Sequence, residues 1–169
     1  MSLKYFLNLL LFSGFLSIFN SCQPTNEKST SLILIRHAEK MIASSNDPQL
    51  STKGWQRANE LVHIFEAVDI DAVYASPYRR TIDTARPLAT AKQLEILQYD
   101  PNKLVSFAQE ILKTHQGETV VIIGHSNTTP QLTNALAGTE YSDLEETEYD
   151  WLYFVEMSPE GTPNVKKLQ

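Results

Sequence analysis

A short apolar run, Leu32–Ile35, constrains the fold of this chain more than any other feature. Its residues are all Leu or Ile, which is typical of a strand buried on both faces inside a parallel sheet. It is followed directly by Arg36, His37 and Ala38. In open α/β sheets, ligands bind beyond the carboxyl ends of the strands, so we expect these side chains to face a ligand.

Two further apolar runs end in the same way. The run Thr119–Ile123 precedes Gly124 and His125, and the run Ile70–Ala75 precedes a segment that contains Arg80. Strand patterns alternate with helix patterns along the chain, so we predict an α/β fold: a three-layer α/β/α sandwich around a mostly parallel central sheet. Predicted strands are Ser31–Ile35, Ile70–Ala75, Leu94–Gln98, Thr119–Ile123, Trp151–Met157 and Asn164–Leu168. The first predicted helix is capped by Ser51 or Thr52 and runs to about Phe65; the others are Ser76–Lys92, Pro101–His115 and Thr129–Gly138.

Composition fits one globular domain with no nucleic-acid partner. The chain has 169 residues, 42% of them hydrophobic, and a formal net charge of −6. Phosphate backbones require a basic protein face, which this balance does not provide. The acidic stretch 140–150 is expected to be a solvated loop.

The first thirty residues are predicted to lie outside the folded domain, as a signal peptide followed by a tether. Lys4 precedes the apolar stretch Tyr5–Ile18, which is too short to span a bilayer, and Cys22 is the single cysteine. We predict a lipoprotein-type signal peptide over 1–21, a polar tether over 22–30 and the folded domain over 31–169. Lipidation of Cys22 would anchor the protein in a bacterial cell envelope, facing the periplasm; an ordinary signal peptide or an uncleaved anchor are the alternatives.

Two histidines and two arginines are expected to meet at one sheet edge. His37 and His125 follow parallel strands, Arg36 precedes His37, and Arg80 lies in the first turn of a predicted helix. Helix N-termini attract anions, and arginines bind phosphoryl groups through paired hydrogen bonds. A zinc site is the alternative for two histidines, but no Cys or spaced His/Asp set accompanies them, so we expect no metal.

Four ordered motifs make the chain similar to the histidine phosphatase superfamily, which includes phosphoglycerate mutases and small phosphohistidine phosphatases. Arg36-His37-Ala38 corresponds to its Arg-His-Gly motif, and the stretch 50–58 to its Leu-Thr-x-x-Gly-x-x-Gln-Ala motif. The stretch 76–85 resembles its Ser-x-x-x-Arg-Ala-x-x-Thr-Ala motif, and 124–126 its Gly-His-Ser motif. The resemblance covers roughly residues 32–136 and implies a phosphoglycerate mutase-like fold.

This resemblance implies a phosphohistidine intermediate. His37 would be the nucleophile, and the phosphate-binding residues would be Arg36, Arg80, His125, Ser126 and Asn127; no cofactor is implied. The general acid is open, because the insertion that carries a glutamate in the mutases is absent. Asp100 and Glu39 are the candidates, and a helix cap is the alternative role for Asp100.

The sequence thus predicts a metal-independent phosphatase acting on a phosphorylated small molecule or a phosphoprotein. A catalytically weak phospho-ligand-binding lipoprotein is the alternative, and a phosphoglycerate mutase is disfavoured by the short chain and its predicted export. Loops 41–49 and 141–149 are expected to determine specificity. Nothing in the sequence indicates the oligomeric state.

Overall fold

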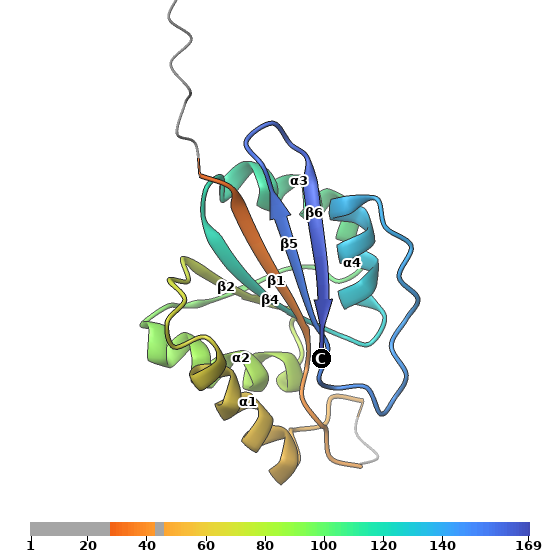
Figure 1. The fold of residues 1–169 in the computed structure, drawn as a ribbon. Helices are drawn as coiled ribbons and strands as arrows, with labels where there is room; N and C mark the ends of the chain where they lie inside the picture. Colours follow the sequence, from red (N-terminus) through yellow and green to blue (C-terminus); the bar gives the residue numbers. More distant parts are fainter. Residues whose placement is uncertain (1–27, 43–45) are drawn as a thin grey trace, which may run out of the picture.

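The computed structural model describes residues 28–42 and 46–169. Within these residues, six strands form one sheet that four helices accompany (Figure 1). The strands are β1 (Thr30–Arg36), β2 (Ala72–Ala75), β3 (Ile96–Gln98), β4 (Thr119–Gly124), β5 (Leu152–Met157) and β6 (Pro163–Leu168). The helices are α1 (Thr52–Ile64), α2 (Arg79–Lys92), α3 (Leu104–Thr114) and α4 (Thr128–Ala137).

The strand order is β3-β2-β4-β1-β5-β6. Strands β1 to β4 pair in parallel, whereas β5 and β6 continue the sheet in antiparallel fashion. The predicted α/β class and mostly parallel sheet are therefore confirmed. Each predicted strand is present, with ends displaced by at most two residues, which is the usual scatter at strand boundaries.

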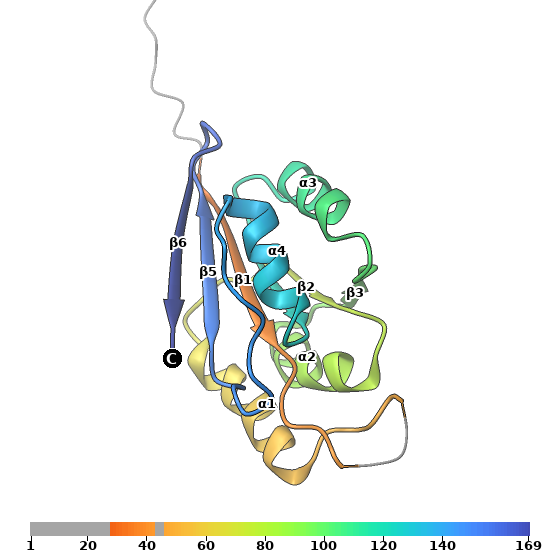
Figure 2. The same cartoon turned by 90° about the vertical axis from the view of Figure 1, so that its right-hand side faces the viewer.

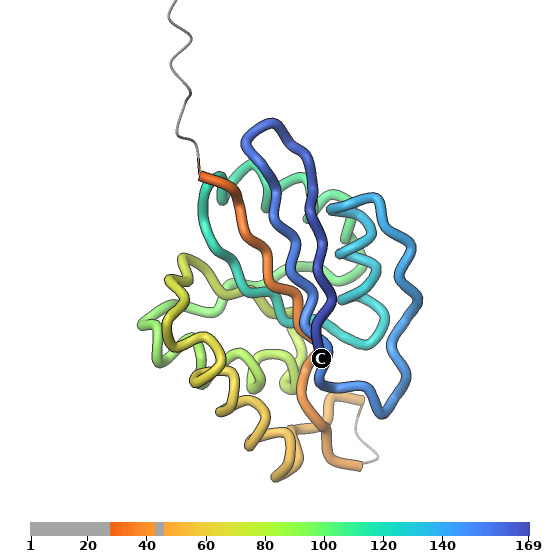
Figure 3. The backbone as a smooth tube through the Cα atoms, viewed as in Figure 1, coloured from red at the N-terminus to blue at the C-terminus, as the bar shows by residue number. Residues whose placement is uncertain are grey.

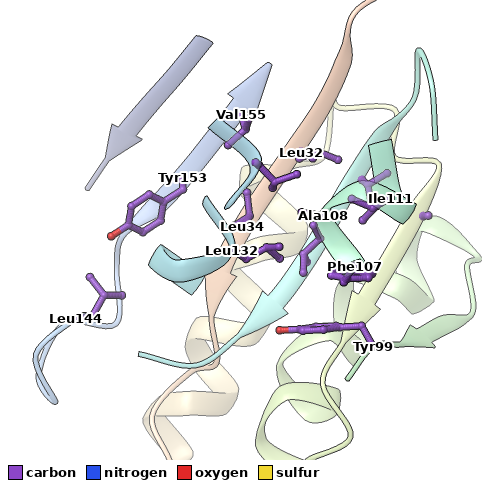
Figure 4. Close-up of a cluster of buried hydrophobic side chains, with 14 residues drawn as sticks. Leu32, Leu34, Tyr99, Phe107, Ala108, Ile111, Leu132, Leu144, Tyr153 and Val155 are labelled. Carbon is purple, nitrogen blue, oxygen red and sulfur yellow. The ribbon is translucent and has the colours of Figure 1, made fainter. Parts of the chain in front are cut away.

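Two hydrophobic clusters lie on opposite faces of the sheet. Along β1, Leu32 and Leu34 belong to the cluster shared with α3 and α4, while Ile33 and Ile35 belong to the cluster shared with α1 and α2. Figure 2 shows α3 and α4 together on one side of the sheet, and Figure 4 shows the side chains of the first cluster. Side chains on a strand alternate between faces, so a run that is apolar at every position must be covered on both sides.

Strand register brings the two histidine-bearing segments together. Arg36, the last residue of β1, pairs with Gly124, the last residue of β4, and Ala75 at the end of β2 pairs with Ile123. His37 and His125 each come one residue after a paired position. The sheet edge predicted to carry the site is therefore a single edge, formed by three adjacent parallel strands.

The predicted start of the second helix at Ser76 is wrong. Helix α2 begins at Arg79, and its N-cap Tyr78 makes no side-chain capping bond. The backbone N–H of Arg79 donates instead to Oδ1 of Asp47, 2.9 Å away, from a different loop. Ser76 does not cap the helix because its hydroxyl is hydrogen-bonded to His125 and Thr81.

Helix α3 also begins later than the sequence predicts. Pro101 lies in a turn, and the helix starts at Leu104. Oδ1 of Asp100 accepts the backbone N–H of Asn102 at 2.9 Å, which stabilises this turn ahead of the helix. The last helix starts at Thr128 and ends before Gly138, which has a left-handed φ of 66°, close to the predicted bounds.

The predicted signal peptide and Cys22 lie outside the described residues. The described helices are all too short or too polar to cross a membrane.

Gly54 is packed so closely that we expect any larger residue to destabilise the fold. A Cβ atom at this position of α1 would lie 2.1 Å from the backbone oxygen of Glu39. Gly54→Ala should lower the free energy of unfolding by about 1–3 kcal/mol or more, because backbone must move. Urea denaturation measures this loss. Lys53→Ala, an exposed change one residue away, is the control; equal stability of the two variants would contradict the prediction.

Candidate functional site

His37 and His125 lie side by side at the carboxyl ends of β1 and β4. Their ring centroids are 5.4 Å apart and the rings meet edge to face. The backbone N–H of His37 donates to the carbonyl of Gly124 at 2.9 Å, which extends the β1–β4 ladder by one residue. The sheet itself thus fixes the separation of the two imidazoles.

His37 is held in a form suited to nucleophilic attack. Its Nδ1 lies 2.8 Å from the carbonyl oxygen of Ala38, so Nδ1 carries the proton and Nε2 has a free lone pair. Burial lowers the pKa of His37 to about 3, although the bond to Ala38 opposes the shift. The imidazole is therefore neutral at physiological pH.

Arg36 is buried and tied to the connection between α4 and β5. Its side chain is 1% exposed, and Nη1 donates to the carbonyl oxygens of Glu145 at 2.7 Å and Glu148 at 2.8 Å. The guanidinium carbon lies 4.0 Å from the ring centroid of Tyr149. Nη2 donates to Glu146, while Nε is buried without a partner. An orphaned donor on a buried cation is a place where an anion can bind.

Arg80 and Ser76 position His125 from opposite sides. Nη2 of Arg80 lies 3.2 Å from Nδ1 of His125, and Oγ of Ser76 lies 2.8 Å from its Nε2. Burial lowers the pKa of His125 to about 4, and the charges of Arg80 and Arg36 add to this effect. Both histidines are thus neutral, and the positive charge near them is carried by Arg36, Arg80 and Lys40.

These side chains open into a cavity of about 1460 Å³. Ser126 and Asn127, which the resemblance implies as phosphate-binding residues, both line it. The cavity wall also includes residues of the β1–α1 connection and of α3. These include Lys40, Met41, Ile42, Leu104, Val105 and Gln109.

The structure does not bring either predicted acid into the cavity. The Glu39 carboxylate accepts two hydrogen bonds from Arg57, at 2.9 and 3.0 Å, and pairs with Lys53. Its burial acts to raise its pKa, but these bonds outweigh that effect and lower it to about 2. Asp100 is exposed, and its pKa is lowered by the backbone bond from Asn102. Neither is among the residues that line the cavity.

The acidic stretch 140–150 is not merely a solvated loop. It passes the carboxyl end of β1, as the tube in Figure 3 shows, and supplies Glu146 and Tyr149 to the cavity. Its carbonyl oxygens bind Arg36, more than a hundred residues away in sequence. No local pattern could have identified this contact; the one available sign was that the loop precedes a strand of the same sheet.

Ser76 and Thr84 are two further site residues whose roles the sequence analysis missed. Ser76 binds His125, whereas Oγ1 of Thr84 accepts the backbone N–H of Ala38 at 2.9 Å and donates to the carbonyl of Arg80. Both lie in the motif that contains Arg80, so the motif itself was the signal. Within the described residues, no group of three or more His, Cys, Asp or Glu side chains is arranged to hold a metal ion.

A protein-family model matches part of this chain. Residues 32–102 match the model of the histidine phosphatase superfamily (branch 1). Phosphoserine phosphatase 1 of Hydrogenobacter thermophilus is 25% identical over 164 residues, which covers 66% of this chain and 78% of that protein.

Solved structures share the fold. The protein histidine phosphatase SixA, complexed with tungstate, superposes with a TM-score of 0.67 at 16% identity, covering 82% of this chain and 96% of SixA. A mycobacterial glucosyl-3-phosphoglycerate phosphatase gives a TM-score of 0.69 at 11% identity, with 83% and 97% covered. At such identities these two likenesses concern the fold alone.

The depressed pKa of His37 predicts an unusual titration. The neutral imidazole persists until the pH falls towards 3, because protonation would place a charge in a buried site beside Arg36. In an imidazole NMR titration, with His37→Ala used to assign the signal, we expect no protonation of His37 between pH 8 and 5. A midpoint near 6.5 would show that burial does not control this group.

Proposed function

We propose that this phosphatase, whose residues 32–102 match the histidine phosphatase superfamily, hydrolyses a phosphomonoester or phosphoramidate without a metal, through a phosphohistidine intermediate on His37. The observation that carries the proposal is the position of Nε2 of His37. It is unprotonated, and His37 lines the same cavity as Arg36, whose buried Nε has no partner, and the Arg80–His125 pair, whose imidazole lies 5.4 Å from that of His37.

The reaction takes place in two displacements. Nε2 of His37 attacks phosphorus, a P–N bond forms and the bond from phosphorus to the leaving group breaks. Nδ1–H of His37 continues to donate its hydrogen bond to the carbonyl oxygen of Ala38. This bond stabilises the positive charge that the ring acquires. Water then attacks phosphorus, the P–N bond breaks, and inorganic phosphate leaves with His37 again neutral.

Two arginines replace the metal ions that other phosphoryl-transfer enzymes use. Arg36 from β1 and Arg80 from α2 both line the cavity that holds the two histidines; Nη2 of Arg80 contacts His125, and Nε of Arg36 has no partner. Preorganised cations stabilise the charge on the equatorial oxygens without any reorganisation during the reaction.

The substrate class is a phosphorylated small molecule or a phosphoprotein. The relative from Hydrogenobacter thermophilus is named a phosphoserine phosphatase and SixA a protein histidine phosphatase, so both ester and phosphoramidate substrates occur among similar proteins. A cavity of about 1460 Å³ leaves room for more than the phosphoryl group.

Turnover of 4-nitrophenyl phosphate with and without EDTA tests the activity. Hydrolysis that survives the chelator is expected. Loss of activity in EDTA, restored by a divalent cation, would contradict a metal-independent enzyme. Saturable phosphate binding without turnover would favour the alternative, a phospho-ligand-binding protein.

Rapid-quench labelling with a phosphorylated substrate tests the nucleophile. His37→Ala should abolish both the acid-labile label and turnover, yet bind phosphate nearly as well, because the arginines remain. His125→Ala or Arg80→Ala should weaken binding as well, and lower the rate by roughly 10²–10³-fold, because each removes a group beside the phosphoryl site. Label that persists on the His37→Ala protein, or that lies on Ser76 or Ser126, would overturn the assignment.

We further propose that the protein is a lipoprotein of a bacterial cell envelope, anchored through Cys22 and facing the periplasm. The support is the order of Lys4, the apolar stretch 5–18, Cys22 and the polar segment before β1. Several acyl chains together hold a protein stably on a membrane.

Cys22→Ser tests this anchor. The variant should either appear in the soluble fraction or keep its uncleaved signal, as measured by membrane fractionation and intact-mass analysis. Unchanged processing and membrane attachment would rule out lipidation at this residue.

A further inference from the structure

Glu146 is the sole carboxylate among the described residues that line the cavity. It comes from the α4–β5 connection, whose backbone carbonyls hold Arg36. Oε2 lies 3.1 Å from Nη2 of Arg36, Oε1 accepts from Nζ of Lys40, and the hydroxyl of Tyr149 lies 3.4 Å from Oε1. The side chain is 67% exposed, so it can change partners without disturbing the core.

The carboxylate of Glu146 occupies a position that a phosphoryl group would compete for. Nε and Nη2 form one edge of the Arg36 guanidinium; Nε has no partner and Nη2 has only Glu146, whereas Nη1 is fixed by two carbonyl oxygens. Such an edge binds two oxygens of a phosphoryl group in parallel. A phosphoryl group bound at this edge would accept the hydrogen bond that Nη2 now donates to Glu146. The carboxyl of Glu146 would then lie next to the phosphoryl oxygens.

This exchange changes the protonation of Glu146. In the free protein, the hydrogen bond from Lys40 and the charge of Arg36 lower the pKa of the carboxyl. Adjacent phosphoryl oxygens favour the protonated form, because like charges disfavour ionisation. A group that gains a proton only when substrate is bound can serve as an acid.

We propose that Glu146 is the general acid of the site, an inference that rests on the proposed function. Its carboxyl gives a proton to the leaving-group atom as the bond from phosphorus to that atom breaks and Nε2 of His37 bonds to phosphorus. The resulting carboxylate then removes a proton from the water that attacks phosphorus in the second displacement. This returns Glu146 to its protonated form at the end of the cycle.

The test is the response of Glu146→Gln to the basicity of the leaving group. 4-Nitrophenol leaves as a stable anion and needs little protonation, whereas phenol needs more. We expect kcat on phenyl phosphate to fall by about 10²-fold, the lower range for a lost general acid, while kcat on 4-nitrophenyl phosphate changes far less. In the wild type, kcat on phenyl phosphate should decline as pH rises through the pKa of the bound-state carboxyl, and the variant should lack this decline.

Two comparisons separate catalysis from a structural role. Glu140→Gln, an exposed acid in the same α4–β5 connection, is the matched control and should behave as wild type. Glu146→Asp should recover part of the activity on phenyl phosphate, since it restores a carboxyl. Circular dichroism melting checks that each variant is folded.

Each other outcome has a distinct meaning. Equal losses on both substrates would mean that Glu146 only positions Arg36, and equal gains would mean that it only competes with substrate; either overturns the proposal. If the wild type turns over neither aryl phosphate, the proposed function fails. If it turns over both, with acid-labile label on His37, but Glu146→Gln matches Glu140→Gln, only the general-acid proposal fails.

Discussion

The parallel pairing of β1 with β4 is the constraint on which the rest of the site depends. Arg36 pairs with Gly124, and the hydrogen bond from His37 to Gly124 continues the ladder, so both histidines leave the sheet at one level. A shift of one residue would turn each side chain to the other face. That register is secured by side chains buried on both faces of β1, which belong to two separate clusters.

A buried guanidinium is costly unless its donors are satisfied, and Arg36 explains why the α4–β5 connection belongs to the site. The loop gives Arg36 two carbonyl oxygens, an aromatic face and a carboxylate. Nη1 is satisfied by two backbone carbonyl oxygens, whereas the partner of Nη2 is the exposed carboxylate of Glu146. The same loop therefore holds the cation in the free protein, and in our proposal its carboxylate gives up Nη2 when a phosphoryl group binds.

Two differences from the sequence-based predictions, at Ser76 and at Glu39, share one cause: polar side chains bond to distant partners instead of local ones. Ser76 fits a helix cap in sequence, yet its hydroxyl lies against His125, and Asp47 accepts the N–H at the helix start. Glu39 adjoins His37 in sequence, but its carboxylate points to Arg57 on α1. Capping patterns and proximity in sequence do not predict hydrogen-bond partners that lie in a distant segment of the chain.

The sequence by itself determined the α/β class, the parallel central strands and the identity of His37, Arg36, Arg80 and His125 as side chains of one edge. An unbroken apolar run of this length is typical of a strand buried on both faces of a parallel sheet, so the residues that follow it lie at the carboxyl edge of the sheet. Only the tertiary structure decided the tautomer of His37, the bond between Ser76 and His125, and the presence of Glu146 on Arg36. These depend on distances between segments far apart in the chain, which packing sets and local sequence does not encode.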